Sequence, residues 1–185
     1  MDREEITRLT LEYGGDWAIN HSLRLLHLIS MIGEGMDYNE EAIWLAAYLH
    51  DWGGYQKWLQ PGIEHYDRSV EVARDFLAER GCPEDLKNLV LEIIQYHHGG
   101  SPDRSIESKL FTDADMLDLL GVVGVLRIFS MVPRNLKGAV AAVKKYRDLY
   151  IAGVSFPKTR ELAEKRLQET EDLLAKLEEE TFGLY

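Results

Sequence analysis

Helical periodicity along almost the whole chain is the feature that most restricts what this sequence can fold into. Proline occurs five times in 185 residues, and no segment shows the sustained alternation of apolar and polar residues that marks a β-strand. We therefore predict an all-α protein. The predicted helices cover about Arg3–Tyr13, Trp17–Ile32, Asn39–Trp52, His65–Arg80, Glu84–His98, Ser105–Leu120, Gly121–Met131, Asn135–Tyr150 and Lys158–Glu180, and a loop is predicted over Tyr55–Glu64.

Glycines set several of the predicted helix ends. Gly14 and Gly15 are predicted to end the first helix, and Asp16 can serve as the N-cap of the second. The third helix is predicted to end at Gly53-Gly54. These breaks divide the apolar pattern into helices of ordinary length.

The length of the chain suits one domain with a sizeable core. No internal repeat, low-complexity tract or linker marks a boundary, so we predict a single compact helical bundle over residues 1–185, with packing helices over about 135–180. The last helix combines dense charge with apolar residues, and we expect it to pack on the body, with a homodimer contact as the alternative. Its apolar residues are Leu162, Leu167, Leu173, Leu174 and Leu177.

The formal net charge of −11, from 32 acidic against 21 basic residues, argues against a nucleic-acid partner. A small anionic substrate remains compatible, because a bound metal and a few local cations can set the field inside a pocket. The most apolar run, residues 121–132, contains Arg127 and is too short to cross a bilayer. The acidic N-terminus is unlike a secretory signal, and Cys82 has no second cysteine to pair with, so we expect a cytoplasmic protein.

Among the six histidines, His50 stands out because Asp51 follows it directly at the end of an apolar helix. Neighbours on a helix point about 100° apart, but at a helix end both side chains can turn toward one ion. A charged aspartate behind such an apolar run would be costly if it lay unpaired in the core. The alternative is that the pair only caps the helix.

His21 lies on a second helix, on the stripe that Leu25 and Leu28 continue inward, and Arg24 shares its face. His27 is six positions from His21, about 120° around the helix, so the two cannot both point at one centre. One of them must be a bystander.

His97 is predicted on the buried face of its helix, and His98 begins the exit from that helix. The residues that define this face are Leu86, Val90 and Ile93. Further along, we expect Asp113 and Asp118 to be solvated. Asp115 has apolar residues four positions away on either side and could face inward, where it would need a cation.

The order of these motifs resembles the HD superfamily of metal-dependent phosphohydrolases, which carries H…HD…H…D along a helical bundle. The matching segments are His21-Ser-Leu-Arg24, Leu49-His50-Asp51-Trp-Gly53, His65, Ile94-Gln-Tyr-His97, Asp113-Ala-Asp115-Met-Leu-Asp118 and, in the closing helix, Ala163-Glu-Lys-Arg166. The resemblance covers about residues 16–177, with the ligand motifs within about 16–120. It implies the small, single-domain type of HD bundle.

This resemblance implies a set of roles for particular residues. The implied metal ligands are His21, His50, Asp51 and Asp115. His65 and His97 would contact those ligands, face the phosphate, or hold a second ion. Asp51 would also orient the attacking water, and Arg24 would contact a phosphate, since guanidinium matches phosphate oxygens bidentately. Lys57 is a weaker phosphate candidate that could equally be an ordinary surface lysine.

Two departures from the family pattern are visible. Trp52 stands where many relatives have isoleucine after the aspartate, which we expect to alter packing more than chemistry. Residues 98–102 lack the Gly-Tyr-Pro signature of the branch that hydrolyses cyclic dinucleotides, so we do not expect that activity.

The function implied by the resemblance is hydrolysis of a phosphate ester or anhydride in a small molecule, with a nucleotide as the expected substrate. The attacking group would be a metal-bound water, and two imidazoles with two carboxylates suit Mn, Mg, Fe, Co, Ni or Zn. One alternative is a non-catalytic regulatory module that binds metal or nucleotide. Another is a di-iron oxygenase, in which His65, His97 and His98 leave room for a second iron.

Overall fold

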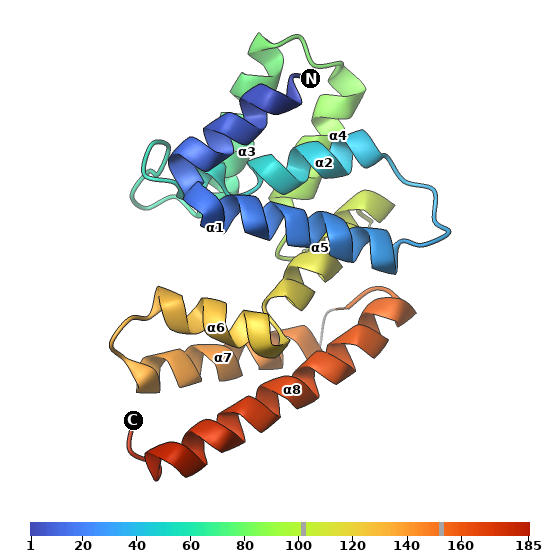
Figure 1. The fold of residues 1–185 in the computed structure, drawn as a ribbon. Coiled ribbons are helices and arrows are strands. Elements are labelled where there is room, and N and C mark those ends of the chain that lie inside the picture. Colours follow the sequence, from blue (N-terminus) through green and yellow to red (C-terminus); the bar gives the residue numbers. More distant parts are fainter. Residues whose placement is uncertain (101–102, 152–153) are drawn as a thin grey trace. The chain divides into compact units, whose positions relative to one another are not determined.

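The computed structural model describes residues 1–100, 103–151 and 154–185. Within these ranges the chain forms eight α-helices, one 3-10 helix and no strand (Figure 1), which confirms the all-α prediction. The helices are α1 (Arg3–Ile32), α2 (Glu40–Leu49), the 3-10 helix η1 (Trp52–Gly54), α3 (His65–Glu79), α4 (Glu84–Gln95), α5 (Ile106–Asp118), α6 (Gly121–Met131), α7 (Leu136–Ile151) and α8 (Pro157–Thr181).

The two helices predicted at the N-terminus are a single bent helix, α1, whose N-cap is Asp2. The bend, visible in Figure 1, lies at Gly15, where φ is +68° and ψ is −170°. A Cβ on the preceding Gly14 would lie 2.6 Å from the ring of Tyr55. The glycine pair therefore bends the helix instead of ending it, and Gly14 gives Tyr55 room to pack against the bend.

Two other predicted helix ends were wrong, and both corrections concern site residues. α2 ends at Leu49, so His50 is its C-cap and the chain turns into η1. α4 ends at Gln95, so His97 lies in the following turn rather than on the helix itself. The backbone leaves helical geometry at Tyr96, where φ is −111° and ψ is 17°.

Residue contacts divide the chain into two compact units, Met1–Thr112 and Asp113–Tyr185. The first unit is built around α2, in which every residue from Ala42 to Leu49 except Trp44 is buried. Helices α1 and α4 both contact α2, and α3 contacts α4 and η1. A helix that is apolar on most sides must be enclosed by others, so His50 and Asp51 follow directly after the buried C-terminal half of α2.

In the second unit α6 contacts both α7 and α8. Its core consists of Val125, Ile128, Val140, Val143 and Leu174, with Leu173 and Leu177 packed against it. The prediction that the last helix packs through its leucines is thereby confirmed for these three residues of α8.

The expectation that Asp113 and Asp118 are solvated was wrong, because both are buried. Asp113 accepts hydrogen bonds from the backbone N–H groups of Ser155 (3.0 Å) and Phe156 (3.1 Å), just before α8 begins. Asp118 pairs with Arg127 of α6. These partners offset the cost of burying charge. Asp115 is buried as predicted, at 6% exposure.

No helix in the described ranges combines the length and the apolar character needed to cross a membrane.

Candidate metal centre

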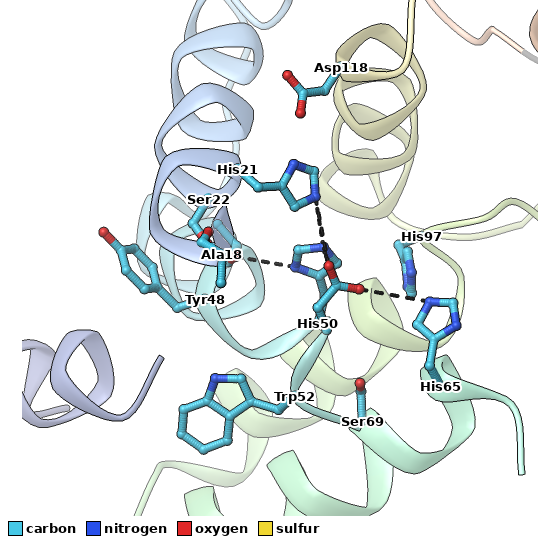
Figure 2. Close-up of polar contacts among 12 residues, drawn as sticks. Ala18, His21, Ser22, Tyr48, His50, Trp52, His65, Ser69, His97 and Asp118 are labelled. Carbon is cyan, nitrogen blue, oxygen red and sulfur yellow. Dashed lines mark hydrogen bonds and ion pairs between the residues drawn. The ribbon is translucent and has the colours of Figure 1, made fainter. Parts of the chain in front are cut away.

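Two buried histidines from different helices meet at the end of α2. His21 comes from α1 and His50 is the C-cap of α2, and their exposed fractions are 3% and 2%. Their Nε2 atoms lie 3.2 Å apart, and Figure 2 shows the two rings turned toward each other. His27 is exposed on α1 and is the bystander. This agrees with the prediction that only one of His21 and His27 can point at the centre.

The backbone selects which nitrogen of His50 is available. Its Nδ1 lies 3.2 Å from the carbonyl oxygen of Ala47, an acceptor, so a proton on Nδ1 is satisfied there and Nε2 is the nitrogen that faces His21 and Asp51. His97 has the same arrangement, with Nδ1 2.6 Å from the carbonyl oxygen of Ile94. A histidine that binds a metal usually donates its other N–H in this way.

The Asp51 carboxylate completes a three-residue cluster with His21 and His50. Its Oδ2 lies 3.3 Å from His50 Nε2 and 4.0 Å from His21 Nε2, and the three ligand atoms lie within 4.8 Å of one another. At this helix end the two members of the pair thus place ligand atoms next to each other, and their binding of one ion stays a prediction. Burial raises the pKa of Asp51, but the charge and hydrogen bond of His50 and the charges of His21 and His97 outweigh it and hold the pKa well below its usual value.

This donor set fits a divalent cation. Two imidazole nitrogens only 3.2 Å apart need a proton or a metal ion between them, because their lone pairs would otherwise repel each other. The ionised carboxylate beside them adds a hard oxygen donor. Two nitrogens with carboxylate oxygen suit Mn²⁺, Fe²⁺, Co²⁺, Ni²⁺ or Zn²⁺ and accommodate Mg²⁺.

A second cluster joins His65, His97 and His98, whose ligand atoms also lie within 4.8 Å of one another. The Nε2 atoms of His65 and His98 are 3.1 Å apart, and Figure 2 shows His65 beside His97. His65 Nε2 also lies 3.8 Å from Asp51 Oδ1. The two oxygens of Asp51 therefore face different clusters, Oδ2 the first and Oδ1 the second.

Close packing between η1 and α3 fixes the position of His65. A Cβ on Gly53 would lie 2.4 Å from the carbonyl oxygen of His65 and 2.4 Å from the amide nitrogen of Ser69. The Gly53 N–H donates to Ser69 Oγ at 2.8 Å. Only glycine permits this approach, which brings the first residue of α3 next to Asp51.

Trp52 anchors the loop that follows the His-Asp pair. It is fully buried, and its indole N–H donates to Thr10 Oγ1 at 3.0 Å. Its ring stacks on Trp58 at 4.6 Å, and the Lys57 ammonium lies over the rings of Tyr13 and Trp58. The tryptophan thus serves packing, as expected from its departure from the family pattern.

The structure brings together five of the predicted site residues: His21, His50, Asp51, His65 and His97. Arg24 is partly buried on α1, and its contact with a phosphate stays a prediction, as does the ligand role of Asp115. Lys57 is exposed, and its ammonium lies over aromatic rings.

Sequence reasoning missed Tyr55 and considered His98 only in the oxygenase alternative. Burial, together with the charge of Asp51, raises the pKa of the Tyr55 hydroxyl, so the phenol stays protonated near the site. The adjacent pair His97-His98 before two glycines was a usable signal for His98. Tyr55 lies in a loop without periodicity, and no pattern in the sequence marks it.

Comparisons with known proteins found one matching family model and several similar solved structures. The HD domain family model matches residues 18–120. In the crystal structure of Bacillus subtilis YpgQ in complex with ADP, the protein shares 27% sequence identity with this chain. The match covers 96% of each chain, with a TM-score of 0.69. A predicted HD superfamily hydrolase from an uncultured Thermotogales bacterium is 26% identical, over 95% of this chain and 89% of that chain, with a TM-score of 0.63. A search of curated proteins found no match.

Proposed function

The chain belongs to the HD domain family, and we propose that it is a metal-dependent phosphohydrolase acting on a small phosphorylated molecule, with nucleotides as the first substrate class. Three observations support a metal-dependent hydrolase. They are the family membership, a solved structure described as a predicted HD superfamily hydrolase, and the cluster of His21, His50 and Asp51. The phosphate chemistry and the nucleotide are our proposal.

The observation that carries the proposal is the convergence of His21, His50 and Asp51 on one point. We propose that these three residues hold a divalent ion and that Asp115 is a fourth ligand. When bound, such an ion lowers the pKa of a coordinated water and neutralises charge on a phosphoryl oxygen.

The protein side chains have distinct roles in this proposal. Asp51 is ionised near neutral pH, since its pKa is held low, and it can accept a hydrogen bond from the attacking water and so orient it. The His65 side chain is 35% exposed, so a substrate can reach it, and it can donate a proton to the leaving oxygen. His97 can stabilise the charge that develops on the phosphoryl group, and Arg24 can hold a substrate phosphate bidentately.

Nucleotides are proposed because the similar Bacillus subtilis protein was crystallised in complex with ADP. At 27% identity over 96% of both chains, this relative supports a related ligand class here. A nucleotide also suits a chain whose negative charge disfavours a long nucleic acid.

The test is release of phosphate or pyrophosphate from nucleoside mono-, di- and triphosphates by metal-loaded protein, across the six divalent metals named above. We expect turnover with at least one metal, and loss of it in His50→Ala. His27→Ala is the matched control, since His27 is exposed on α1, and it should retain wild-type activity. A metal-loaded protein that turns over no substrate in this panel would favour the non-catalytic module.

As the alternative to proton donation by His65 and charge stabilisation by His97, we propose that His65, His97 and His98 hold a second ion, supported by their mutual distances and by Asp51 Oδ1 beside His65. Elemental analysis should then find close to two ions per chain in wild type and one in His98→Ala. One ion in both proteins would contradict this. Iron-dependent absorbance with oxygen consumption would instead favour the oxygenase alternative.

A further inference from the structure

The proposed ligand Asp115 lies in the last turn of α5, which ends at Asp118. The last four carbonyl groups of a helix have no partners within it, and such a turn tends to fray. A metal ligand needs a fixed position, so something outside α5 must hold this turn.

Arg127 of α6 binds the end of this turn at two points. Its guanidinium donates to the carboxylate of Asp118 and, at 3.4 Å, to the carbonyl oxygen of the same residue. The side chains of Arg127 and Asp118 are 12% and 2% exposed. This pair is therefore shielded from solvent, unlike a surface ion pair that water and salt would weaken.

Arg166 of α8 supplies a second cation to the same turn, because its guanidinium donates to the carbonyl oxygen of Leu117. Positive groups at the C-terminal end of a helix bind its free carbonyls and complement its dipole. Two helices that sequence reasoning treated as packing elements thus converge on one helix end.

The other side of Asp115 is held too, because Asp113 accepts the N–H groups of Ser155 and Phe156. Asp115 therefore lies between Asp113 and residues 117–118, all of which are hydrogen-bonded from outside α5. The donors are Ser155, Phe156, Arg127 and Arg166.

We infer that Arg127 and Arg166 are positioning residues for Asp115, which they act on by capping the last turn of α5. The inference rests on the proposed function, in which Asp115 is a metal ligand. Loss of residues that orient a ligand usually lowers metal affinity by about 10- to 100-fold.

The main test is the double variant Asp118→Leu/Arg127→Met, which removes both buried charges together, a change that proteins often tolerate without loss of stability. Arg166→Gln is the second variant, on a partly buried residue. Arg147→Met is the matched control, because Arg147 forms an exposed ion pair with Glu171. Each protein is titrated with Mn²⁺ by calorimetry well below its melting temperature, and the visible spectrum of its Co²⁺ form is recorded.

We expect the Kd for Mn²⁺ to rise about 10- to 100-fold in the double variant and in Arg166→Gln, with a changed Co²⁺ spectrum. The single variant Arg127→Lys keeps the positive charge but not the planar guanidinium. Its Kd for Mn²⁺ should lie between that of wild type and that of the double variant. The control should match wild type.

Folded variants with wild-type affinity and an unchanged Co²⁺ spectrum would overturn the inference, whatever their melting temperature. Wild-type affinity in Asp115→Asn would also overturn it, while leaving a hydrolase with the three-residue site. A wild-type protein that binds no divalent ion would overturn both the proposed function and this inference.

Discussion

Replacement of Asp51 by asparagine is expected to lower kcat/KM for phosphate release by about a thousandfold or more. A bound ion contributes several kcal/mol to transition-state stabilisation, and about 1.4 kcal/mol corresponds to a tenfold change in rate. Asp51 is both the proposed ligand and the proposed group that orients water, so the substitution removes two functions at once. Asparagine keeps the size of the side chain, so the helical circular dichroism should be unchanged.

The matched control for this variant is Asp37→Asn, because Asp37 is exposed in the connection between α1 and α2. It should leave both kcat and KM at wild-type values. Retention of more than about a tenth of wild-type kcat/KM in Asp51→Asn would contradict the assigned mechanism.

Gly53→Ala is expected to give the second largest effect, through packing rather than chemistry. The added Cβ would meet backbone atoms of His65, Arg68 and Ser69 at 2.4 to 2.7 Å, and backbone within a helix cannot yield cheaply. Overpacking of this kind costs about 1–3 kcal/mol of unfolding free energy. Because η1 then moves away from α3, His65 moves away from Asp51, and kcat/KM should fall by about a hundredfold.

The adjacent glycine provides the control for Gly53→Ala. At Gly54 the nearest atom to an added Cβ is His65 Cβ, at 3.7 Å, an ordinary van der Waals distance. Gly54→Ala should therefore change the free energy of unfolding by less than about 0.5 kcal/mol and leave kcat/KM near wild type. Urea denaturation and steady-state kinetics measure both effects, and equal behaviour of the two variants would show that the close approach of α3 does not position His65.

The positions of the helices were the part of the fold that the sequence predicted best. Each helix has its own spacing of apolar residues, and glycines or prolines lie near its ends. The errors lie where tertiary contacts override local signals. Gly15 bends α1 without ending it, since helical geometry resumes on its far side. The predicted helix over Glu84–His98 stops at Gln95, so the buried His97 occupies a turn.

The candidate site could be predicted as far as residue types in a known order allow. His21 and His50 are 29 positions apart, and only the packing of α1 on α2 brings their Nε2 atoms to 3.2 Å. The partner of a buried acid is harder to foresee, because it comes from a distant segment. Asp113 looked like a solvated residue, but it binds backbone N–H groups at positions 155 and 156.

The central claim is that His21, His50 and Asp51 hold a catalytic metal ion. Its most direct test is anomalous X-ray scattering from crystals of the wild-type protein grown with Mn²⁺. The account predicts an anomalous peak within about 2.5 Å of Nε2 of both histidines and of an Asp51 carboxylate oxygen. Mn²⁺ bound only elsewhere on the chain, with no peak among these three residues, would contradict it.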